Sequence, residues 1–262
     1  MPLNPPQQDW HGKVVWLVGA STGIGRATAS ALHARGAQVI VSARNALALR
    51  EFSDSHPGTV VLPLDVTDVA AVRLAAAQVT ARHDLSLLLY SAGHYHAMGA
   101  RSFNLADLNH HLQVNYGGLL NVLESIVPHF LERSKQGKQA AGLHISMVGS
   151  VAGYSGLPKS LAYGPTKAAM INLAETLHGD LQDAGIGVSL ISPGFVDTPL
   201  TAQNEFAMPA LITPEQAAGE ILLGWAQGEF EIHFPKRFTL WLKLLRILPY
   251  RLAFFATRRL TH

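Results

Sequence analysis

Short apolar segments recur along the chain, and stretches with helical periodicity fill most of the gaps between them. Each segment is a nearly continuous run of Val, Ile, Leu and aromatic residues, which is the pattern of a strand buried on both faces. Such strands, alternating with helices, form a parallel sheet, and right-handed crossovers make it doubly wound. We predict an α/β protein with a parallel sheet of seven strands, at residues 14–18, 39–41, 60–62, 85–90, 143–146, 188–191 and 230–234.

The same pattern gives no reason to divide the chain into two folded domains. The first strand is followed by a helical stretch, Ala27 to Ala34, and no repeat, low-complexity segment or linker interrupts the later elements. Residues 1–235 are therefore predicted to form one catalytic domain, and residues 236–262 a basic, amphipathic helical tail.

Composition agrees with a globular α/β protein. Of the 262 residues, 48% are hydrophobic and 15% are charged, which argues against disorder. The absence of cysteine excludes structural disulfides and thiolate chemistry. Residues 1–10 lack the apolar run of a secretory signal, and no stretch of ~20 apolar residues could span a membrane. We therefore expect a cytoplasmic protein.

A glycine-rich turn follows the first predicted strand. Its sequence is Gly19-Ala20-Ser21-Thr22-Gly23-Ile24-Gly25, and a helical pattern comes next. A chain that must turn sharply, bring backbone N–H groups close to a diphosphate and start a helix packed on the strand requires glycine. A tight turn without a ligand is the alternative, but the strand before it and the helix after it favour cofactor binding.

The spacing Gly-x-x-x-Gly-x-Gly resembles that of the short-chain dehydrogenase/reductase family, and the resemblance extends from Lys13 to Phe234. Matching motifs are Asp65-Val66, Ala92-Gly93, Val114-Asn115, Ser150, Tyr163, Lys167, and Pro193-Gly194 with Thr198. At Tyr90-Ser91 the chain departs from the Asn-Asn that the family usually has, which puts one hydrogen-bonded link of the central sheet in doubt. The resemblance implies a Rossmann-type fold and an NAD(P) site formed by Gly19, Ser21, Thr22, Gly23, Ile24, Gly25, Asp65, Val66, Ala92, Gly93, Asn115, Tyr163, Lys167, Pro193, Gly194, Val196 and Thr198.

Tyr163 and Lys167 are four residues apart, so on a helix they share one face. A nearby ammonium favours the phenolate and lowers the pKa of a tyrosine from its usual ~10. Tyr163 could then exchange a proton with a carbonyl or alcohol oxygen, which Ser150 would also hold by a hydrogen bond. The resemblance further implies that Lys167 holds the nicotinamide ribose and Asn115 a water. An ordinary surface tyrosine is the alternative explanation of Tyr-x-x-x-Lys alone. Pro165 places the start of this helix near Tyr163.

The second strand is followed by Ala43-Arg44, where an NAD enzyme usually has an acidic residue for the ribose 2′-hydroxyl. Arg44 can instead pair with a 2′-phosphate. NADP(H) is therefore favoured over NAD(H), and a solvated arginine is the alternative.

The chain contains thirteen histidines, but their pattern predicts no metal site. His110 and His111 are adjacent and so point in different directions on a helix, and no cysteine or carboxylate cluster accompanies them. His94, Tyr95 and His96 follow the fourth strand near the expected active-site mouth. They either contact substrate or are ordinary loop residues.

The formal charge of +2 conceals an asymmetry, because the last 27 residues contain seven basic side chains and no acidic one. In the helical stretch Phe238 to Leu248, Thr239, Lys243 and Arg246 form one polar stripe, Pro249 ends the helix, and Tyr250 to Leu260 repeats the composition. Such helices lie on an anionic membrane surface, cover the substrate site or pack in an oligomer interface, and the sequence leaves the three open. Nucleic acid is disfavoured, since aliphatic residues interrupt the basic ones.

The predicted function is hydride transfer between a nicotinamide cofactor and a carbonyl or secondary alcohol. The alternative is a catalytically silent dinucleotide-binding sensor or scaffold, and an epimerase or dehydratase on the same fold is a third possibility. Leu157, Phe195, Phe206 and Met208 favour an apolar substrate, which the sequence does not identify. The resemblance implies a homodimer or homotetramer, paired through helices at about Asp107–Leu131 and Leu161–Asp183.

Overall fold

All seven predicted strands are present in one parallel sheet. The computed structural model describes residues 2–136, 142–204 and 208–258. The strands are β1 (Val14–Val18), β2 (Gln38–Ser42), β3 (Val60–Val61), β4 (Leu85–Tyr90), β5 (His144–Val148), β6 (Gly187–Pro193) and β7 (Glu231–Phe234). Their order is β3-β2-β1-β4-β5-β6-β7, so the winding direction reverses between β1 and β4. Ligands of doubly wound folds bind at the carboxyl ends of the strands flanking this reversal.

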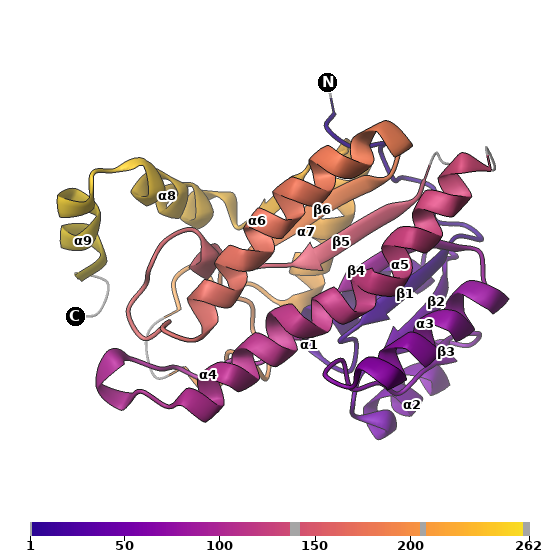
Figure 1. Ribbon diagram of the computed structural model, residues 1–262, viewed down its shortest axis with the longest axis horizontal. Coiled ribbons are helices and arrows are strands. Elements are labelled where there is room, and N and C mark those ends of the chain that lie inside the picture. The colour runs from indigo at the N-terminus through magenta and orange to yellow at the C-terminus, as the bar shows by residue number, and fades with distance from the viewer. Residues whose placement is uncertain (1, 137–141, 205–207, 259–262) are drawn as a thin grey trace.

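Helices cover both faces of the sheet (Figure 1). The helices are α1 (Gly23–His33), α2 (Ala46–Ser55), α3 (Val69–Arg82), α4 (Leu105–His111), α5 (Gly118–Lys135), α6 (Tyr163–Leu181), α7 (Pro214–Gln227), α8 (Lys236–Ile247) and α9 (Tyr250–Arg258). One core packs α3, α5 and α6 against the sheet, and the other packs α1, α2 and α7. Along β1 the side chains alternate between the cores, with Trp16 in the first and Leu17 in the second. Both faces are therefore dry, which explains the continuous apolar runs of the strands.

Local sequence signals set the ends of α6 and α7. Helix α6 begins at Tyr163 as predicted, with Pro165 in its first turn where its missing N–H costs nothing. Before α7, Thr213 and Gln216 form a reciprocal capping box, and Gly228 ends the helix in the left-handed conformation.

Two helical segments differ from the sequence prediction. Helix α1 begins at Gly23, four residues before the predicted start, because the glycine turn itself forms the first helical turn. The helix expected at about Asp107–Leu131 is divided by a π-helical segment, Leu112–Gly117, between α4 and α5. Asn115 lies in that segment and is fully buried.

The N-terminal residues pack against the start of β6 and the end of α7. The Asn4 side chain is buried, donates to the Val188 carbonyl oxygen at 2.8 Å and accepts from the Val188 N–H at 3.0 Å. The Gln7 N–H donates to the Trp225 carbonyl oxygen at 2.8 Å. The first residues therefore join β6 to the end of α7.

The C-terminal helices α8 and α9 lie at one end of the molecule, beyond the body of the sheet (Figure 1). Helix α8 ends before Leu248, whose extended backbone is the conformation expected ahead of Pro249. Within the described residues, no helix has the length and apolar character needed to cross a membrane.

Candidate active site

A cavity of about 590 Å³ lies at the carboxyl ends of the central strands, where the winding reverses. It is lined by the glycine turn, the ends of β4, β5 and β6, and the start of α6. All predicted cofactor residues except Gly25 and Asn115 line it, and Ser150 does too. Sequence reasoning missed Asn45, Leu200 and Thr201, which also line the cavity and belong to no motif.

The glycine turn packs so closely against neighbouring backbone that Gly19 and Gly25 leave no room for a side chain. Gly19 has a φ of 93°, and a Cβ there would lie 2.3 Å from the Ala92 nitrogen. A Cβ on Gly25 would lie 2.4 Å from the Gly19 carbonyl oxygen, so Gly25 supports the turn from behind instead of lining the cavity. The resulting cradle has the form that a diphosphate requires, with the N-terminus of α1 beside it.

Tyr163, Ser150 and Lys167 come together at the inner end of the cavity. The Ser150 side chain is near enough to the Tyr163 phenol to lower its pKa, and its hydroxyl accepts from the Ala152 N–H at 3.1 Å. Lys167 is buried, its Nζ lies 5.5 Å from the centre of the Tyr163 ring, and it donates to the Val148 carbonyl oxygen at 2.7 Å. A phenol, a hydroxyl and an ammonium therefore meet on one wall.

Burial dominates the titration of this group. It raises the pKa of Tyr163 far above that of an ordinary phenol, although the Ser150 side chain opposes the shift. The Tyr163 side chain is only partly covered and lines the cavity. The net shift of this pKa is upward, opposite to the lowering that Lys167 was predicted to produce, because burial outweighs the groups that favour the phenolate. Burial also lowers the pKa of Lys167 to about 7.

Asn115 does not line the cavity, and it fixes the segment that follows β4. Its Oδ1 accepts from the His94 N–H at 2.6 Å, and its Nδ2 donates to the His94 carbonyl oxygen at 3.0 Å. Nδ2 also donates to the Thr166 hydroxyl at 3.1 Å, in the first turn of α6 that begins at Tyr163. The π-helical segment aims this side chain at both partners, and π segments recur at functional sites.

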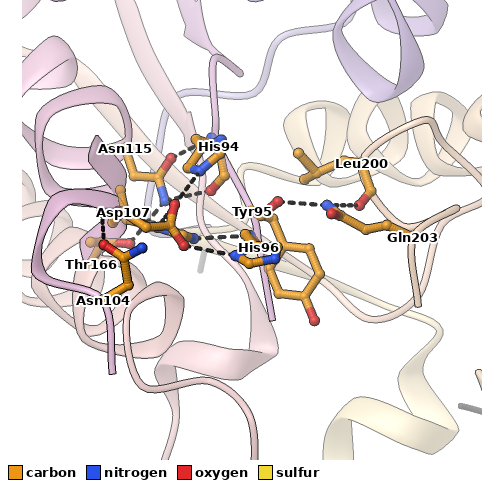
Figure 2. Close-up of polar contacts among 10 residues, drawn as sticks. His94, Tyr95, His96, Asn104, Asp107, Asn115, Thr166, Leu200 and Gln203 are labelled. Carbon is orange, nitrogen blue, oxygen red and sulfur yellow. Dashed lines mark hydrogen bonds and ion pairs between the residues drawn. The ribbon is translucent and has the colours of Figure 1, made fainter. Parts of the chain in front are cut away.

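A histidine and aspartate network surrounds this segment (Figure 2). His94 Nε2 and His96 Nδ1 lie 2.9 and 2.8 Å from the two carboxylate oxygens of Asp107. Burial disfavours the charged form of Asp107, but the two histidine hydrogen bonds outweigh it and hold its pKa below the usual value. Sequence reasoning missed Asp107, because it lies in another element and no motif marks it.

His94, Asp107 and His111 are close enough to share a metal ion, and they are the one such group among residues 2–136, 142–204 and 208–258. Both nitrogens of His111 are already engaged, however. Nδ1 bonds the Asp107 carbonyl oxygen at 2.8 Å, and Nε2 accepts from the His96 N–H at 3.0 Å. The network thus acts as a hydrogen-bonded support, and the expected absence of a metal stays a prediction.

Tyr95 packs against Tyr163. Its ring meets that of Tyr163 edge to face, with centroids 5.0 Å apart, and its hydroxyl donates to Asn204 Oδ1 at 3.0 Å. Its carbonyl oxygen accepts from Gln203 Nε2 at 2.5 Å, and Figure 2 shows the same amide reaching Leu200. The segment after β4 and the segment after β6 therefore close together over the site.

The residues chosen as apolar substrate contacts are placed differently. None of Leu157, Phe195 and Met208 lines the cavity, and Phe195 packs against Phe238 of α8 with ring centroids 5.6 Å apart. Phe206 lies outside the described residues. The apolar residues of the segment after β6 that do line the cavity are Val196 and Leu200.

At the opposite end, Arg44 and Asp65 are exposed on the rim of the cavity. The pKa of Asp65 is lowered, first by the backbone N–H of Thr67 and also by the charge of Arg44. Ala43 occupies the position after β2, so among the described lining residues Arg44 carries the positive charge at this rim.

The departure at Tyr90 does not leave the sheet unlinked. The Tyr90 hydroxyl is fully buried and donates to the Val114 carbonyl oxygen at 2.6 Å, which joins β4 to the π-helical segment. Gly118 makes this possible, since a Cβ there would lie 2.5 Å from that hydroxyl. Tyrosine and glycine together supply the link that the sequence put in doubt.

Comparison with known proteins agrees with this geometry. The family model for short chain dehydrogenases matches residues 13–208. An uncharacterised oxidoreductase of Myxococcus xanthus is 32% identical over 250 residues, which are 93% of this chain and 96% of the relative. One of Staphylococcus epidermidis is 30% identical over 217 residues, 82% of this chain and 91% of the relative.

Solved structures share the fold. A short chain dehydrogenase from Burkholderia cenocepacia in complex with NADP has a TM-score of 0.75 and 26% identity, over 87% of this chain and 89% of that one. A family structure from Burkholderia phymatum in complex with NAD has a TM-score of 0.81 at 22% identity, over 91% and 94%. With the glycine turn, the doubly wound sheet and the family match over residues 13–208, the chain belongs to the short-chain dehydrogenase family of oxidoreductases.

Proposed function

We propose that the protein transfers a hydride between a nicotinamide cofactor and a carbonyl compound or secondary alcohol, with Tyr163 as the acid and base. The observation that carries this proposal is the meeting of Tyr163, Ser150 and Lys167 on one wall of the cavity. The glycine turn and the ends of β4 and β6 would hold a nicotinamide cofactor, which would supply or accept the hydride at the carbon that bears the reacting oxygen.

The residues of the chain would manage the proton and the charge on oxygen. Tyr163 Oη gives its proton to the substrate oxygen during reduction, and Ser150 Oγ donates a hydrogen bond to the same oxygen. Because burial raises the pKa of Tyr163, the protonated hydroxyl is the resting form, which suits an acid. Lys167 reaches the same wall from one turn further along α6 and can stabilise the phenolate left behind.

NADP(H) is the proposed cofactor. Arg44 lies exposed on the rim, and Ala43 offers no carboxylate to bind a ribose 2′-hydroxyl. Of the solved structures compared, one is in complex with NADP and one with NAD, so the proposal of NADP(H) rests on Arg44 and Ala43. We also propose that the enzyme works in the cytoplasm as a homodimer or homotetramer on an apolar substrate.

The test is the variant Tyr163→Phe, which keeps the ring and removes the proton donor. With NADPH and a panel of aldehydes and ketones, turnover should fall by about 10²–10⁴-fold, the usual size of a general acid contribution. Binding of NADPH, followed by its fluorescence, should stay unchanged. A variant that keeps the wild-type kcat would show that Tyr163 is not the acid.

The alternative is a silent dinucleotide-binding sensor. It would bind NADPH through the same cradle, yet the wild-type protein would reduce no member of the panel. The complete Ser150, Tyr163 and Lys167 group in the cavity favours the enzyme.

A further inference from the structure

Helix α8 is packed with its polar stripe toward the protein. Thr239 is fully buried, and its hydroxyl is hydrogen-bonded to His233 Nδ1 at 2.6 Å. Lys243 Nζ lies 2.7 Å from a Glu231 carboxylate oxygen. Surface helices of globular proteins normally direct the apolar stripe to the core and the polar one to water. In α8, Thr239 and Lys243 contact β7, and Leu242, which is 5% exposed, joins the core beside them. The helix therefore packs through polar and apolar side chains together, and much of its apolar surface is left outside.

As a result, large apolar side chains point outward along both C-terminal helices. We refer to residues 236–258, which contain α8 and α9, as the C-terminal arm. Its apolar side chains are between 42% and 79% exposed at Leu240, Trp241, Leu244, Ile247, Tyr250, Leu252 and Phe254. Leu240, Leu244 and Ile247 are three or four residues apart, and Trp241 is three residues before Leu244, so the four form one continuous face of α8. Contiguous exposed apolar surface of this kind marks an interaction site.

Charge indicates what the arm contacts. Arg237 and Arg251 are exposed on the two helices, and no Asp or Glu occurs between residues 236 and 262. The preceding residues carry a formal charge of −5. A partner must therefore be both apolar and anionic, and outward-pointing side chains of the arm must be able to insert into it. A bilayer with acidic headgroups has all three properties, and Trp and Tyr favour its interfacial region.

The contacts of α8 hold the arm against the body, so it can present this face in a fixed orientation. Besides Glu231 and His233, Phe238 packs on Phe195 next to Gly194, one of the residues lining the cavity. Lys243 also lies over the Tyr154 ring, 6.0 Å from its centre.

We propose that the C-terminal arm binds the surface of an anionic lipid bilayer. The apolar face of α8 and the side chains of α9 enter the interfacial layer, while Arg237 and Arg251 contact the headgroups. The helices lie in the plane of the membrane and do not cross it.

The tryptophans provide a direct probe. Trp10, Trp16 and Trp225 are at most 3% exposed, whereas Trp241 is 70% exposed. We would titrate the full chain, without cofactor or substrate, with vesicles of phosphatidylglycerol and phosphatidylcholine or of phosphatidylcholine alone. With the anionic vesicles we expect a blue shift of the emission and quenching by brominated lipid chains, both reversed by high salt.

Two pairs of variants separate apolar from electrostatic binding. Ile247→Glu should weaken binding at least tenfold, while Leu74→Glu, an equally exposed change on α3, should not. Arg251→Glu should weaken it about fivefold or more, since each basic residue near anionic lipid contributes roughly that factor. Arg50→Glu, an exposed arginine on α2, is its control.

Absence of any shift with anionic vesicles at low salt would overturn the proposal, as would equal binding to neutral vesicles. If the arm instead pairs with a second copy, the protein will ignore vesicles and Ile247→Glu will lower its mass in light scattering. Vesicle binding by Tyr163→Phe should equal that of the wild type, so this test is independent of hydride transfer.

Discussion

Lys167 occupies the least favourable position for a charge in the candidate site. Its side chain is 3% exposed, and burial lowers its pKa to about 7. Lys167 donates a hydrogen bond to the carbonyl oxygen of Val148, and this bond does not replace full hydration of the ammonium group. Burying the Lys167 ammonium next to Tyr163 thus lowers the free energy of unfolding. Buried charges of this kind are common at sites where the chemistry requires a charge.

This burial predicts a pH dependence of stability. The unfolded lysine titrates near ~10.5, so between pH ~7 and ~10.5 the unfolded chain binds more protons and the free energy of unfolding rises with pH. In Lys167→Met this contribution should disappear. The total rise in the free energy of unfolding that is lost amounts to a few kcal/mol between pH ~7 and ~10.5. Denaturant unfolding at pH 6, 8 and 10 would measure it, with Lys135→Met, an exposed lysine, as the control. Parallel curves for wild type and Lys167→Met would contradict it.

Arg44 governs a second prediction at the scale of one residue. Only NADPH carries a 2′-phosphate, so Arg44→Ala should weaken NADPH binding roughly ten- to a hundredfold, the loss of a charge-assisted bond of ~1.5–3 kcal/mol. NADH binding should change little, and Ala43→Asp should shift preference toward NADH. Dissociation constants for both cofactors provide the measurement. Equal losses for the two would remove Arg44 from the binding site.

At the scale of elements, the junction of β4 with the π-helical segment depends on a matched pair, Tyr90 and Gly118. The tyrosine hydroxyl reaches Val114 only because position 118 has no side chain. A Cβ on Gly118 would also lie 2.6 Å from a methyl carbon of Val66. The junction is therefore intolerant of even one added carbon.

We predict that Gly118→Ala lowers the free energy of unfolding by roughly 1–3 kcal/mol, the usual cost of overpacking. Gly179→Ala is the matched control, because that glycine is exposed within α6 and nothing lies within 4 Å of an added Cβ. It should be stabilising by roughly 0.5–1 kcal/mol. Denaturant unfolding of both variants would test the difference in sign, and two equal effects would refute the packing argument.

The same elements show what sequence can and cannot predict. The strands were predictable because burial on both faces leaves a continuous apolar run, and α6 because Pro165 marks its first turn. The π-helical segment was not, since Asn115 is held there by His94 and Thr166, partners that only tertiary structure supplies. Asp107 escaped for the same reason, since its partners His94 and His96 lie in another element, whereas Tyr95 was placed near the active-site mouth but its partner Asn204 was not predictable.

At the scale of the whole molecule, assembly is the next expectation. The family resemblance implies pairing through the stretches that contain α5 and α6, and Leu112 and Leu120 are 47% and 40% exposed there. Light scattering at micromolar concentration should give at least twice the 28.2 kDa of one chain. Leu120→Arg should reduce that mass, and Leu74→Arg on α3 should not. A monomeric wild type would contradict this prediction.

The N-terminal segment has a consequence for the order in which the chain can fold. Asn4 is bonded to Val188, and the N–H groups of Leu3 and Asn4 donate to the carbonyl oxygen of Gly228. During synthesis on the ribosome these first residues emerge before any of their partners exist, and more than 220 further residues must follow. Leu3 and Asn4 therefore reach these native contacts only after Gly228 has been made, so hydrogen exchange at Asn4 reports the late joining of this segment to β6 and α7.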